Sequence, residues 1–139
     1  MRNAIIFLDS GDTLVDESTE VRIKGDVVDH AEFFPGIKDV LFQLKNAGFR
    51  VALVADGLVE SFDNIYQQHE METYFEVRAI SETVGVCKPA GEMFKTAMEK
   101  MNLEEADKKY IIMIGNNLER DIVGANRMGI TSVLAGYSP

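Results

Sequence analysis

Four short polar segments, each close to an apolar run, contain the residues of this sequence that could do chemistry. They are residues 9–13, residues 55–58, the loop around Lys88, and residues 115–121. An aspartate can attack a phosphoryl group and carry it as an acyl phosphate. The negative charge at such a centre must be neutralised, which is the work of Mg²⁺ together with a lysine. Each of the four segments therefore supplies a group that phosphate chemistry requires.

Within these segments the oxygen-bearing side chains are suited to a hard cation. Asp9 and Asp121 can supply carboxylate ligands, and Asn116 or Asn117 can supply a neutral amide oxygen. This donor set is suited to Mg²⁺, which keeps several water ligands in proteins. Gly57 and its neighbour open a predicted helix, so their backbone N–H groups could bind a phosphate.

Each of these residues also has an ordinary structural explanation. Asp, Ser and Gly favour turns, so residues 9–13 could form a loop with local hydrogen bonds. Lys88 could be a solvated surface charge, and Asp121 could favour the positive end of its own helix. Cys87, next to Lys88, could have a lowered pKa and be reactive. The functional interpretation therefore depends on a fold that brings the segments together.

The hydrophobic pattern predicts such a fold. Short continuous apolar runs predict buried strands, and apolar residues at helical spacing predict helices between them. The strands are expected at residues 4–8, 49–55, 75–80, 110–114 and 130–134, and the helices at 37–47, 58–69, 118–128 and after Pro89. Residues 81–88 are expected to form a loop, and Lys24-Gly25-Asp26 a hairpin turn.

This alternation predicts one α/β domain over residues 1–139: a Rossmann-like parallel sheet of about five strands with helices on both faces. The carboxyl ends of parallel strands meet at one edge of a sheet, where ligands bind in open α/β folds. Asp9 to Thr13, the segment after residue 55, the Lys88 loop and residues 115–121 are all expected at that edge.

Composition sets limits on the class of protein. The chain has 139 residues, of which 46% are hydrophobic and 27% charged, which is a globular composition. Its net charge of −9 gives no bulk attraction to nucleic acid or to an anionic membrane. The single cysteine excludes an internal disulfide and fits a reducing compartment. No apolar run approaches the roughly 20 residues of a membrane span, so we expect a cytoplasmic protein.

The order of these segments resembles that of the haloacid dehalogenase (HAD) superfamily, whose largest group is the Mg²⁺-dependent phosphatases. The family opens with an apolar strand and Asp-x-Asp-x-Thr, and FLDSGDT at residues 7–13 matches its first Asp and its Thr. Its second signature falls on residues 51–55, and its lysine falls on Lys88 in CKPAGEMF. Its fourth signature, Gly-Asp-x-x-x-x-Asp, falls on GNNLERD at residues 115–121.

The resemblance implies a role for each matched residue. Asp9 would be the nucleophile, and its carboxylate would share a Mg²⁺ ion with the Gly11 carbonyl. Asn116 and Asp121 would complete the metal site, and Lys88 would neutralise charge. The contacts to substrate would come from the four residues beside the nucleophile and after the second signature: Ser10, Ala55, Asp56 and Gly57.

Three positions depart from the family pattern. Gly11 stands where the family has its general acid and base, and the nearest carboxylate is that of Asp12, one position later. Ala55 replaces a hydroxyl that would bind phosphate, and Asn116 replaces a carboxylate of the metal shell. Loss of acid and base assistance slows a reaction by roughly 10²–10⁴-fold, so these changes lower the expected efficiency of a phosphatase. We nevertheless include Asp12 among the candidate catalytic residues.

The spacing between the signatures leaves no room for the cap domain that encloses small substrates in relatives. A hairpin flap at about residues 17–34 is the largest insertion. Capless relatives take large substrates or borrow a neighbouring subunit as a lid, so the expected partners are a phosphorylated small molecule, a larger phosphorylated substrate, or a second copy of the chain.

Three functions remain open from the sequence. The first is Mg²⁺-dependent hydrolysis of phosphate monoesters through an aspartyl-phosphate on Asp9. The second, suggested by Gly11, Ala55 and Asn116, is a non-catalytic HAD-like domain that binds a phosphorylated ligand or a protein partner. The third is different covalent chemistry on Asp9, as in the family's dehalogenases and phosphonatases, which also lack an acid at the position of Gly11.

Overall fold

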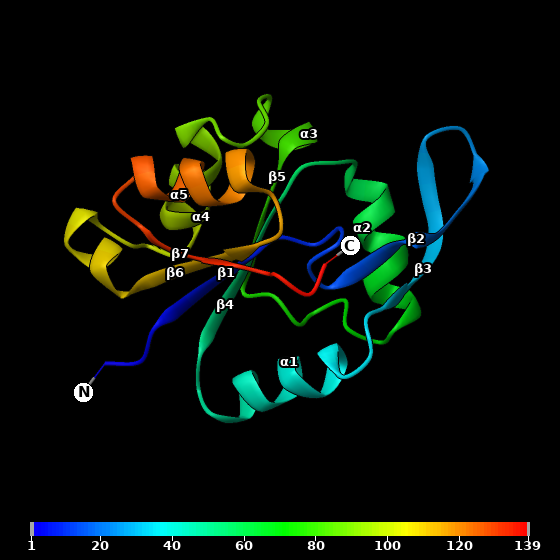
Figure 1. Ribbon diagram of the computed structural model, residues 1–139, viewed down its shortest axis with the longest axis horizontal. Coiled ribbons are helices and arrows are strands. Elements are labelled where there is room, and N and C mark those ends of the chain that lie inside the picture. The colour runs from blue at the N-terminus through cyan, green and yellow to red at the C-terminus, as the bar shows by residue number, and fades with distance from the viewer. Residues whose placement is uncertain (1, 139) are drawn as a thin grey trace.

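The computed structural model describes residues 2–138 and contains a parallel sheet of five strands (Figure 1). The strand order is β5-β4-β1-β6-β7, so the first strand lies in the middle. The strands are β1 Ile5–Leu8, β4 Arg50–Ala55, β5 Val77–Ile80, β6 Ile111–Gly115 and β7 Thr131–Leu134. All four neighbouring pairs are parallel. The predicted fold class, a five-stranded parallel α/β sheet, is therefore confirmed.

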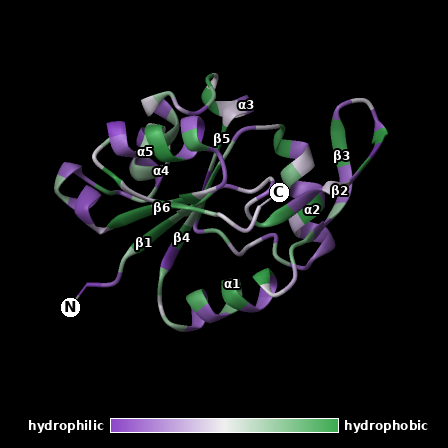
Figure 2. Ribbon diagram, viewed as in Figure 1, coloured by the Kyte–Doolittle hydropathy of each residue, from purple (hydrophilic) through white to green (hydrophobic). Residues whose placement is uncertain are grey.

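The central strands are buried because helices cover both faces of the sheet. Every residue of β1 is buried, as expected for its uninterrupted apolar run. Phe7 lies between Ala52 of β4 and Met113 of β6 in the register. Figure 2 shows these central strands as the most hydrophobic part of the chain, whereas the helices alternate between hydrophobic and hydrophilic surfaces.

Each face of the sheet has its own core. One core contains Leu41 of α1 and Phe62, Ile65 and Tyr66 of α2; the other contains residues of α4 and Ala125 of α5. The helices are α1 Ile37–Asn46, α2 Val59–Gln68, α3 Ser81–Val84, α4 Gly91–Lys100 and α5 Gly124–Arg127, and a short 3₁₀ helix spans Glu105–Tyr110. In Figure 1, α1 lies on one side of the sheet and α4 with α5 on the other.

Two predicted segments differ from the structure. Residues 81–84, expected as part of a loop, form the helix α3, which ends at Gly85 with a positive φ of 95°. Residues 118–128, expected as one helix, begin with a wide π-helical turn at Leu118–Val123 before α5. In that turn the Ile122 N–H donates to the Asn117 carbonyl five residues back, and the turn includes the buried residue Asp121.

The predicted hairpin is present, close to the expected residues 17–34. It consists of β2 Val15–Lys24 and β3 Val27–Phe33, which pair antiparallel around Gly25. It packs on α2, where Ser61 Oγ accepts a hydrogen bond from the Val28 N–H at 2.9 Å and Asn64 Nδ2 donates to the Val28 carbonyl at 2.9 Å. Figure 1 shows the tip of the hairpin extending beyond α2. Because Val28 pairs with Arg22 close to the turn, these two contacts attach the outer part of the hairpin to α2.

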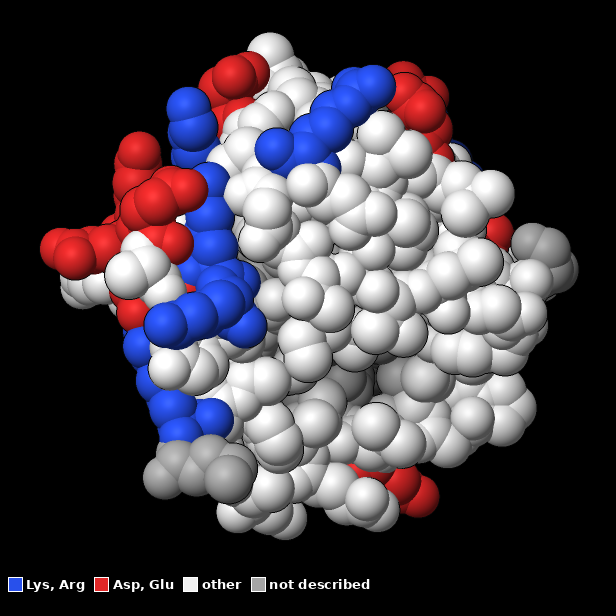
Figure 3. All heavy atoms as spheres, turned by 60° about the vertical axis from the view of Figure 1, so that its left-hand side comes forward, with Lys and Arg blue, Asp and Glu red and all other residues white. Residues whose placement is uncertain are grey.

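The described residues hold no separate cap domain, because only the hairpin separates β1 from α1 and only α2 separates β4 from β5. Across residues 2–138, no helix is long and apolar enough to cross a membrane. Figure 3 turns the left-hand side of Figure 1 forward and shows few charged side chains across the middle of that face, with Lys and Arg gathered along one margin. The net charge of −9 is thus distributed unevenly over the surface.

Candidate active site

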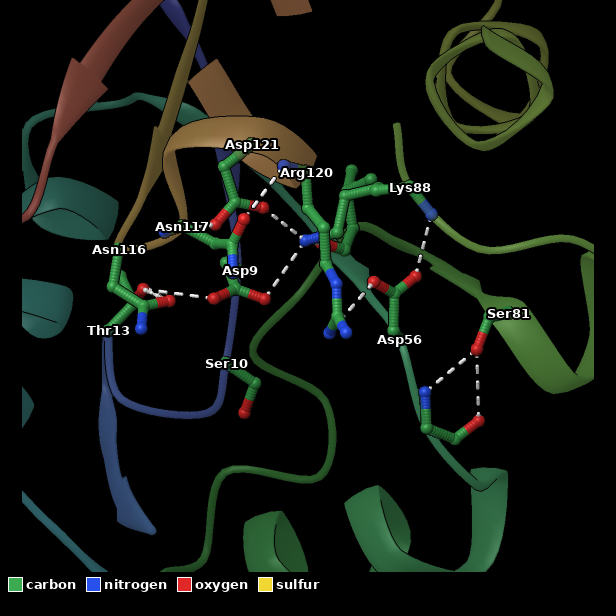
Figure 4. A network of polar contacts seen from close by, with 12 residues as sticks. Asp9, Ser10, Thr13, Asp56, Ser81, Lys88, Asn116, Asn117, Arg120 and Asp121 are labelled. Carbon is green, nitrogen blue, oxygen red and sulfur yellow. Dashed lines mark hydrogen bonds and ion pairs between the residues drawn. The ribbon is translucent and has the colours of Figure 1, made fainter. Parts of the chain in front are cut away.

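The ammonium group of Lys88 lies at the centre of the polar segments at the carboxyl edge of the sheet (Figure 4). Its Nζ donates to Asp9 Oδ1 at 2.9 Å, to Asp121 Oδ1 at 2.6 Å and to the Val54 carbonyl at 2.8 Å. The side chain is almost completely buried, with 3% of the residue exposed. The fold thus brings together three residues that lie up to 112 positions apart, from Asp9 to Asp121.

The two carboxylates keep this buried lysine charged. Burial by itself lowers the pKa of Lys88, but the negative charges of Asp9 and Asp121 outweigh burial and raise that pKa above its ordinary value. A buried ammonium is costly unless it is paired and hydrogen-bonded, and here all three of its protons have acceptors. The lysine therefore places a fixed positive charge beside the candidate nucleophile.

The second carboxylate oxygen of Asp9 faces a different set of partners. Thr13 Oγ1 donates to Asp9 Oδ2 at 3.0 Å. One amide atom of Asn116 lies 2.9 Å from the same Oδ2 and 3.3 Å from the Gly11 carbonyl oxygen. As a nitrogen, this atom would donate to both oxygens. As an oxygen, it would lie close to two other oxygens, and a hard cation stabilises such oxygens when they turn toward it.

Asp121 is held by the loop that carries it. Its Oδ2 accepts a hydrogen bond from the Asn117 N–H at 3.1 Å, and the Asn117 side chain in turn accepts from the Arg120 N–H at 2.9 Å. Residues 2–138 contain no group of three His, Cys, Asp or Glu residues placed to hold a metal ion. A cation here would therefore use two carboxylates and neutral oxygens, and a donor set with so few charges fits Mg²⁺ better than a soft metal.

Three of the residues expected to bind substrate make contacts within the protein instead. Ser10 Oγ lies 2.8 Å from the Tyr66 hydroxyl in a buried contact, and burial raises the pKa of that tyrosine so that it stays protonated. Ala55 is buried in the core. Asp56 Oδ1 accepts a hydrogen bond from the Lys88 N–H at 2.9 Å, so its carboxylate positions the lysine loop.

The N–H of Gly57 was expected to be available to phosphate, and this expectation is wrong for the described conformation. That N–H donates to Ser81 Oγ at 2.8 Å, and the Val59 N–H donates to Glu82 Oε1 at 2.9 Å. Both acceptors belong to α3, the helix that the sequence analysis treated as a loop. The start of α2 is therefore already capped by neighbouring side chains.

Asp12, the candidate acid from the sequence, is turned toward the start of the hairpin. Its backbone has a positive φ of 55°, and its Oδ1 accepts a hydrogen bond from the Glu17 N–H at 3.0 Å. It does not line the cavity that contains Asp9. The structure therefore separates Asp12 from the other candidate site residues.

A cavity of about 350 Å³ opens between the hairpin, α2 and the loops of the sheet edge. Several charged residues that were not predicted from the sequence line this cavity: Glu17, Glu20, Arg22, Asp26 and Arg120. Burial is the main cause that raises the pKa of both Glu17 and Glu20. The alternating polar residues of β2 were a signal that one face of the hairpin is hydrophilic, but the pattern alone did not show that this face meets Asp9.

Comparisons with known proteins agree with this fold. A family model described as haloacid dehalogenase-like hydrolase matches residues 10–135. A glyceraldehyde 3-phosphate phosphatase from Pyrococcus abyssi is 34% identical over 104 residues, which is 74% of this chain and 42% of that protein. The chain therefore spans less than half the length of this relative.

Solved structures of low sequence identity share the fold. The putative HAD-hydrolase YfnB from Bacillus subtilis, solved bound to magnesium, superposes with a TM-score of 0.79 at 14% identity and covers 96% of this chain and 87% of that one. A HAD phosphatase from Thermococcus onnurineus gives a TM-score of 0.78 at 15% identity, with 94% and 85% covered. Because the family model covers most of the chain, this protein belongs to the haloacid dehalogenase-like hydrolases.

Proposed function

We propose that this chain hydrolyses phosphate monoesters through an aspartyl-phosphate on Asp9. The observation that carries the proposal is the contact of the Lys88 ammonium with Asp9 and Asp121, at 2.9 Å and 2.6 Å, at the floor of a cavity. A carboxylate beside a fixed ammonium is arranged to meet the charge of a phosphoryl group. The relative from Pyrococcus abyssi, a glyceraldehyde 3-phosphate phosphatase, supports this reaction class.

In the proposed reaction a carboxylate oxygen of Asp9 forms a bond to phosphorus and the ester bond to the leaving oxygen breaks. Water then attacks the phosphorus, the bond to Asp9 breaks, and inorganic phosphate leaves. Lys88 offsets negative charge throughout, and Thr13 holds the orientation of the Asp9 carboxylate through its 3.0 Å hydrogen bond. Splitting the displacement into two steps is the general advantage of covalent catalysis.

The proposed cofactor is Mg²⁺, held by Asp9, the Gly11 carbonyl, Asn116 and Asp121. When bound, a divalent ion in such a site neutralises the charge of the phosphoryl oxygens. The assignment is supported by the position of the Asn116 amide, one atom of which lies 2.9 Å from Asp9 Oδ2 and 3.3 Å from the Gly11 carbonyl oxygen. The substitution of a carboxylate by Asn116 reduces the negative charge of the site, so we expect millimolar rather than micromolar Mg²⁺ to be needed.

The proposed substrate is a phosphorylated small molecule, because the Pyrococcus relative is a glyceraldehyde 3-phosphate phosphatase. A larger phosphorylated substrate, or a second copy of the chain as a lid, would also fit a site that has only the hairpin as a cover. The reaction would take place in the cytoplasm.

Phosphate release from 4-nitrophenyl phosphate with Mg²⁺ tests the proposal. We expect turnover by the natural sequence, loss of at least about 10³-fold in Asp9→Asn, and unchanged turnover in Asp39→Asn, a matched change at an exposed position of α1. Equal rates for the natural sequence and Asp9→Asn would end the proposal.

The alternative is a HAD-like domain that binds a phosphorylated ligand without turning it over. The observation that favours it is that Asp12, the candidate general acid from the sequence, does not line the cavity that contains Asp9. Isothermal titration calorimetry with inorganic phosphate and Mg²⁺ separates the two functions. Binding that Asp9→Asn retains, without any phosphate release by the natural sequence, would support the alternative.

A further inference from the structure

The carboxyl group of Glu17 occupies the space in which a side chain at position 11 would lie. A Cβ atom built on Gly11 would be 2.7 Å from Glu17 Oε1, 2.9 Å from its Cδ and 3.2 Å from its Cγ. Real Cβ atoms essentially never approach another atom so closely. The chain therefore replaces a side chain two residues after Asp9 with a carboxyl group that comes from β2.

The base of the hairpin fixes this placement. The Glu17 N–H donates to Asp12 Oδ1 at 3.0 Å, and the Asp12 N–H donates to the Val15 carbonyl at 2.6 Å. The carboxylate of Asp12 is thereby used to hold the first turn of the hairpin against the loop after β1. This explains why Asp12 itself does not enter the cavity, while Glu17 does.

The side chain of Glu17 also has no fixed partner among the described residues. Among the residues that the structure describes, no hydrogen bond or ion pair holds its carboxylate, which lines the cavity. The neighbouring carboxylate of Glu20 contacts Arg22 at 3.1 Å. A carboxyl group that lines the cavity without a fixed partner is free to exchange a proton with a ligand.

Three other ionisable side chains beside Asp9 already have partners. The Lys88 ammonium donates to three acceptors, and Asp121 accepts from Lys88 and from the Asn117 N–H. Asp56 accepts from the Lys88 N–H, and its second oxygen lies 3.9 Å from the Arg120 guanidinium. None of these side chains can give up or take a proton without breaking the contacts that hold the site together.

We propose that Glu17 is the general acid and base of this site, acting in place of a side chain at position 11. This inference rests on the proposed function. In the first step Asp9 bonds to phosphorus, the ester bond breaks, and its electron pair goes to the leaving oxygen, which takes the proton of the Glu17 carboxyl group. In the second step water attacks phosphorus and gives a proton to the Glu17 carboxylate while the bond to Asp9 breaks, which restores both residues.

The test compares two leaving groups, because an alkoxide needs a proton to leave and a nitrophenolate does not. We expect Glu17→Gln to lower the turnover of glycerol phosphate by about 10²–10⁴-fold. With 4-nitrophenyl phosphate, the same variant should release a rapid burst of nitrophenol equal to the enzyme concentration and then turn over slowly, because the second step still lacks its base. Glu32→Gln, a matched change at an exposed position of β3, should behave as the natural sequence.

A rescue variant excludes an effect on folding. In Glu17→Ala the space beside Gly11 is free, so Gly11→Asp added to Glu17→Ala should regain at least about tenfold of the lost glycerol phosphate turnover. Thermal melts of all variants serve as a check on the fold. Recovery of turnover without a rise in melting temperature cannot follow from restored stability.

Two outcomes would overturn the inference. If Glu17→Gln slows both substrates equally without a burst, or slows neither, Glu17 is not the proton donor even though Asp9-dependent turnover stands. If the natural sequence shows no Asp9-dependent turnover, the proposed function and this inference fail together. The comparison of Asp9→Asn with Glu17→Gln therefore separates the two proposals.

Discussion

The carboxyl group of Asp121 lies against the α-carbon of Gly115, at the end of β6. A Cβ atom built on Gly115 would overlap with Cγ and Oδ2 of Asp121 and come within 2.6 Å of its Cβ. Asp121 is buried and bonded to Lys88 and to the Asn117 N–H, so it has no room to move aside. Glycine at position 115 is therefore a requirement of the site geometry.

From this contact we expect Gly115→Ala to displace Asp121 and to break its bond with Lys88. Phosphatase activity should fall by at least about 10²-fold, and the free energy of unfolding should fall by about 1–3 kcal/mol, the usual cost of overpacking. Gly136→Ala is the matched control, because a Cβ at that position meets nothing within 4 Å. Steady-state kinetics and urea unfolding of both variants provide the measurement, and full activity in Gly115→Ala would contradict the arrangement described here.

Removal of the Lys88 charge should change how strongly Mg²⁺ raises the melting temperature. Lys88→Met leaves the carboxylates of Asp9 and Asp121 unpaired in a buried site, and breaking such a pair costs about 3–5 kcal/mol. Because Mg²⁺ would offset some of this repulsion, the melting temperature of Lys88→Met should rise more on addition of Mg²⁺ than that of the natural sequence. Lys95→Met, at an exposed position of α4, is the control. An equal Mg²⁺ effect in both variants would argue against a cation beside Asp9.

Asn116 offers a direct test of the proposed metal site. Asn116→Asp places a carboxylate oxygen next to Asp9 Oδ2 and the Gly11 carbonyl, where one Asn116 amide atom now lies. We expect Mg²⁺ affinity to rise at least about tenfold, equivalent to about 1.4 kcal/mol. Asn117→Asp adds the same charge one residue away and keeps an oxygen that can accept from the Arg120 N–H, so its affinity should change much less. Calorimetric titration with Mg²⁺ distinguishes the two variants.

The parallel sheet made the convergence of Asp9, Lys88 and Asp121 predictable from the sequence. Asp9 and Asp121 follow the strands β1 and β6, and the ends of adjacent parallel strands meet at one edge whatever the details of packing. The position of Glu17 was not predictable in this way. It depends on the turn that Asp12 holds at the base of the hairpin and on the docking of the hairpin on α2 through Ser61 and Asn64, and the sequence pattern shows neither.

The error at Gly57 has a similar origin. Residues 81–84 are too few to show a helical period, so they were interpreted as a loop. The Ser81 hydroxyl at the start of α3 then accepts the Gly57 N–H, which local reasoning had left for phosphate. A prediction made one segment at a time cannot foresee a side-chain acceptor that comes from another element.

Ser10 provides the last test, because the sequence analysis assigned it to substrate binding whereas its hydroxyl contacts the Tyr66 hydroxyl at 2.8 Å in the core. Tyr66→Phe leaves Ser10 Oγ without that partner, and an unsatisfied buried polar group costs about 1–3 kcal/mol. Adding Ser10→Ala to Tyr66→Phe should regain part of this stability, because both polar groups are then removed together. We expect Ser10→Ala alone to leave the KM for 4-nitrophenyl phosphate within about twofold, since only its backbone would face a substrate. If Ser10→Ala raises the KM tenfold or more and leaves stability unchanged, the Ser10 hydroxyl binds substrate. That result would contradict a structural role in the hydrogen bond with Tyr66.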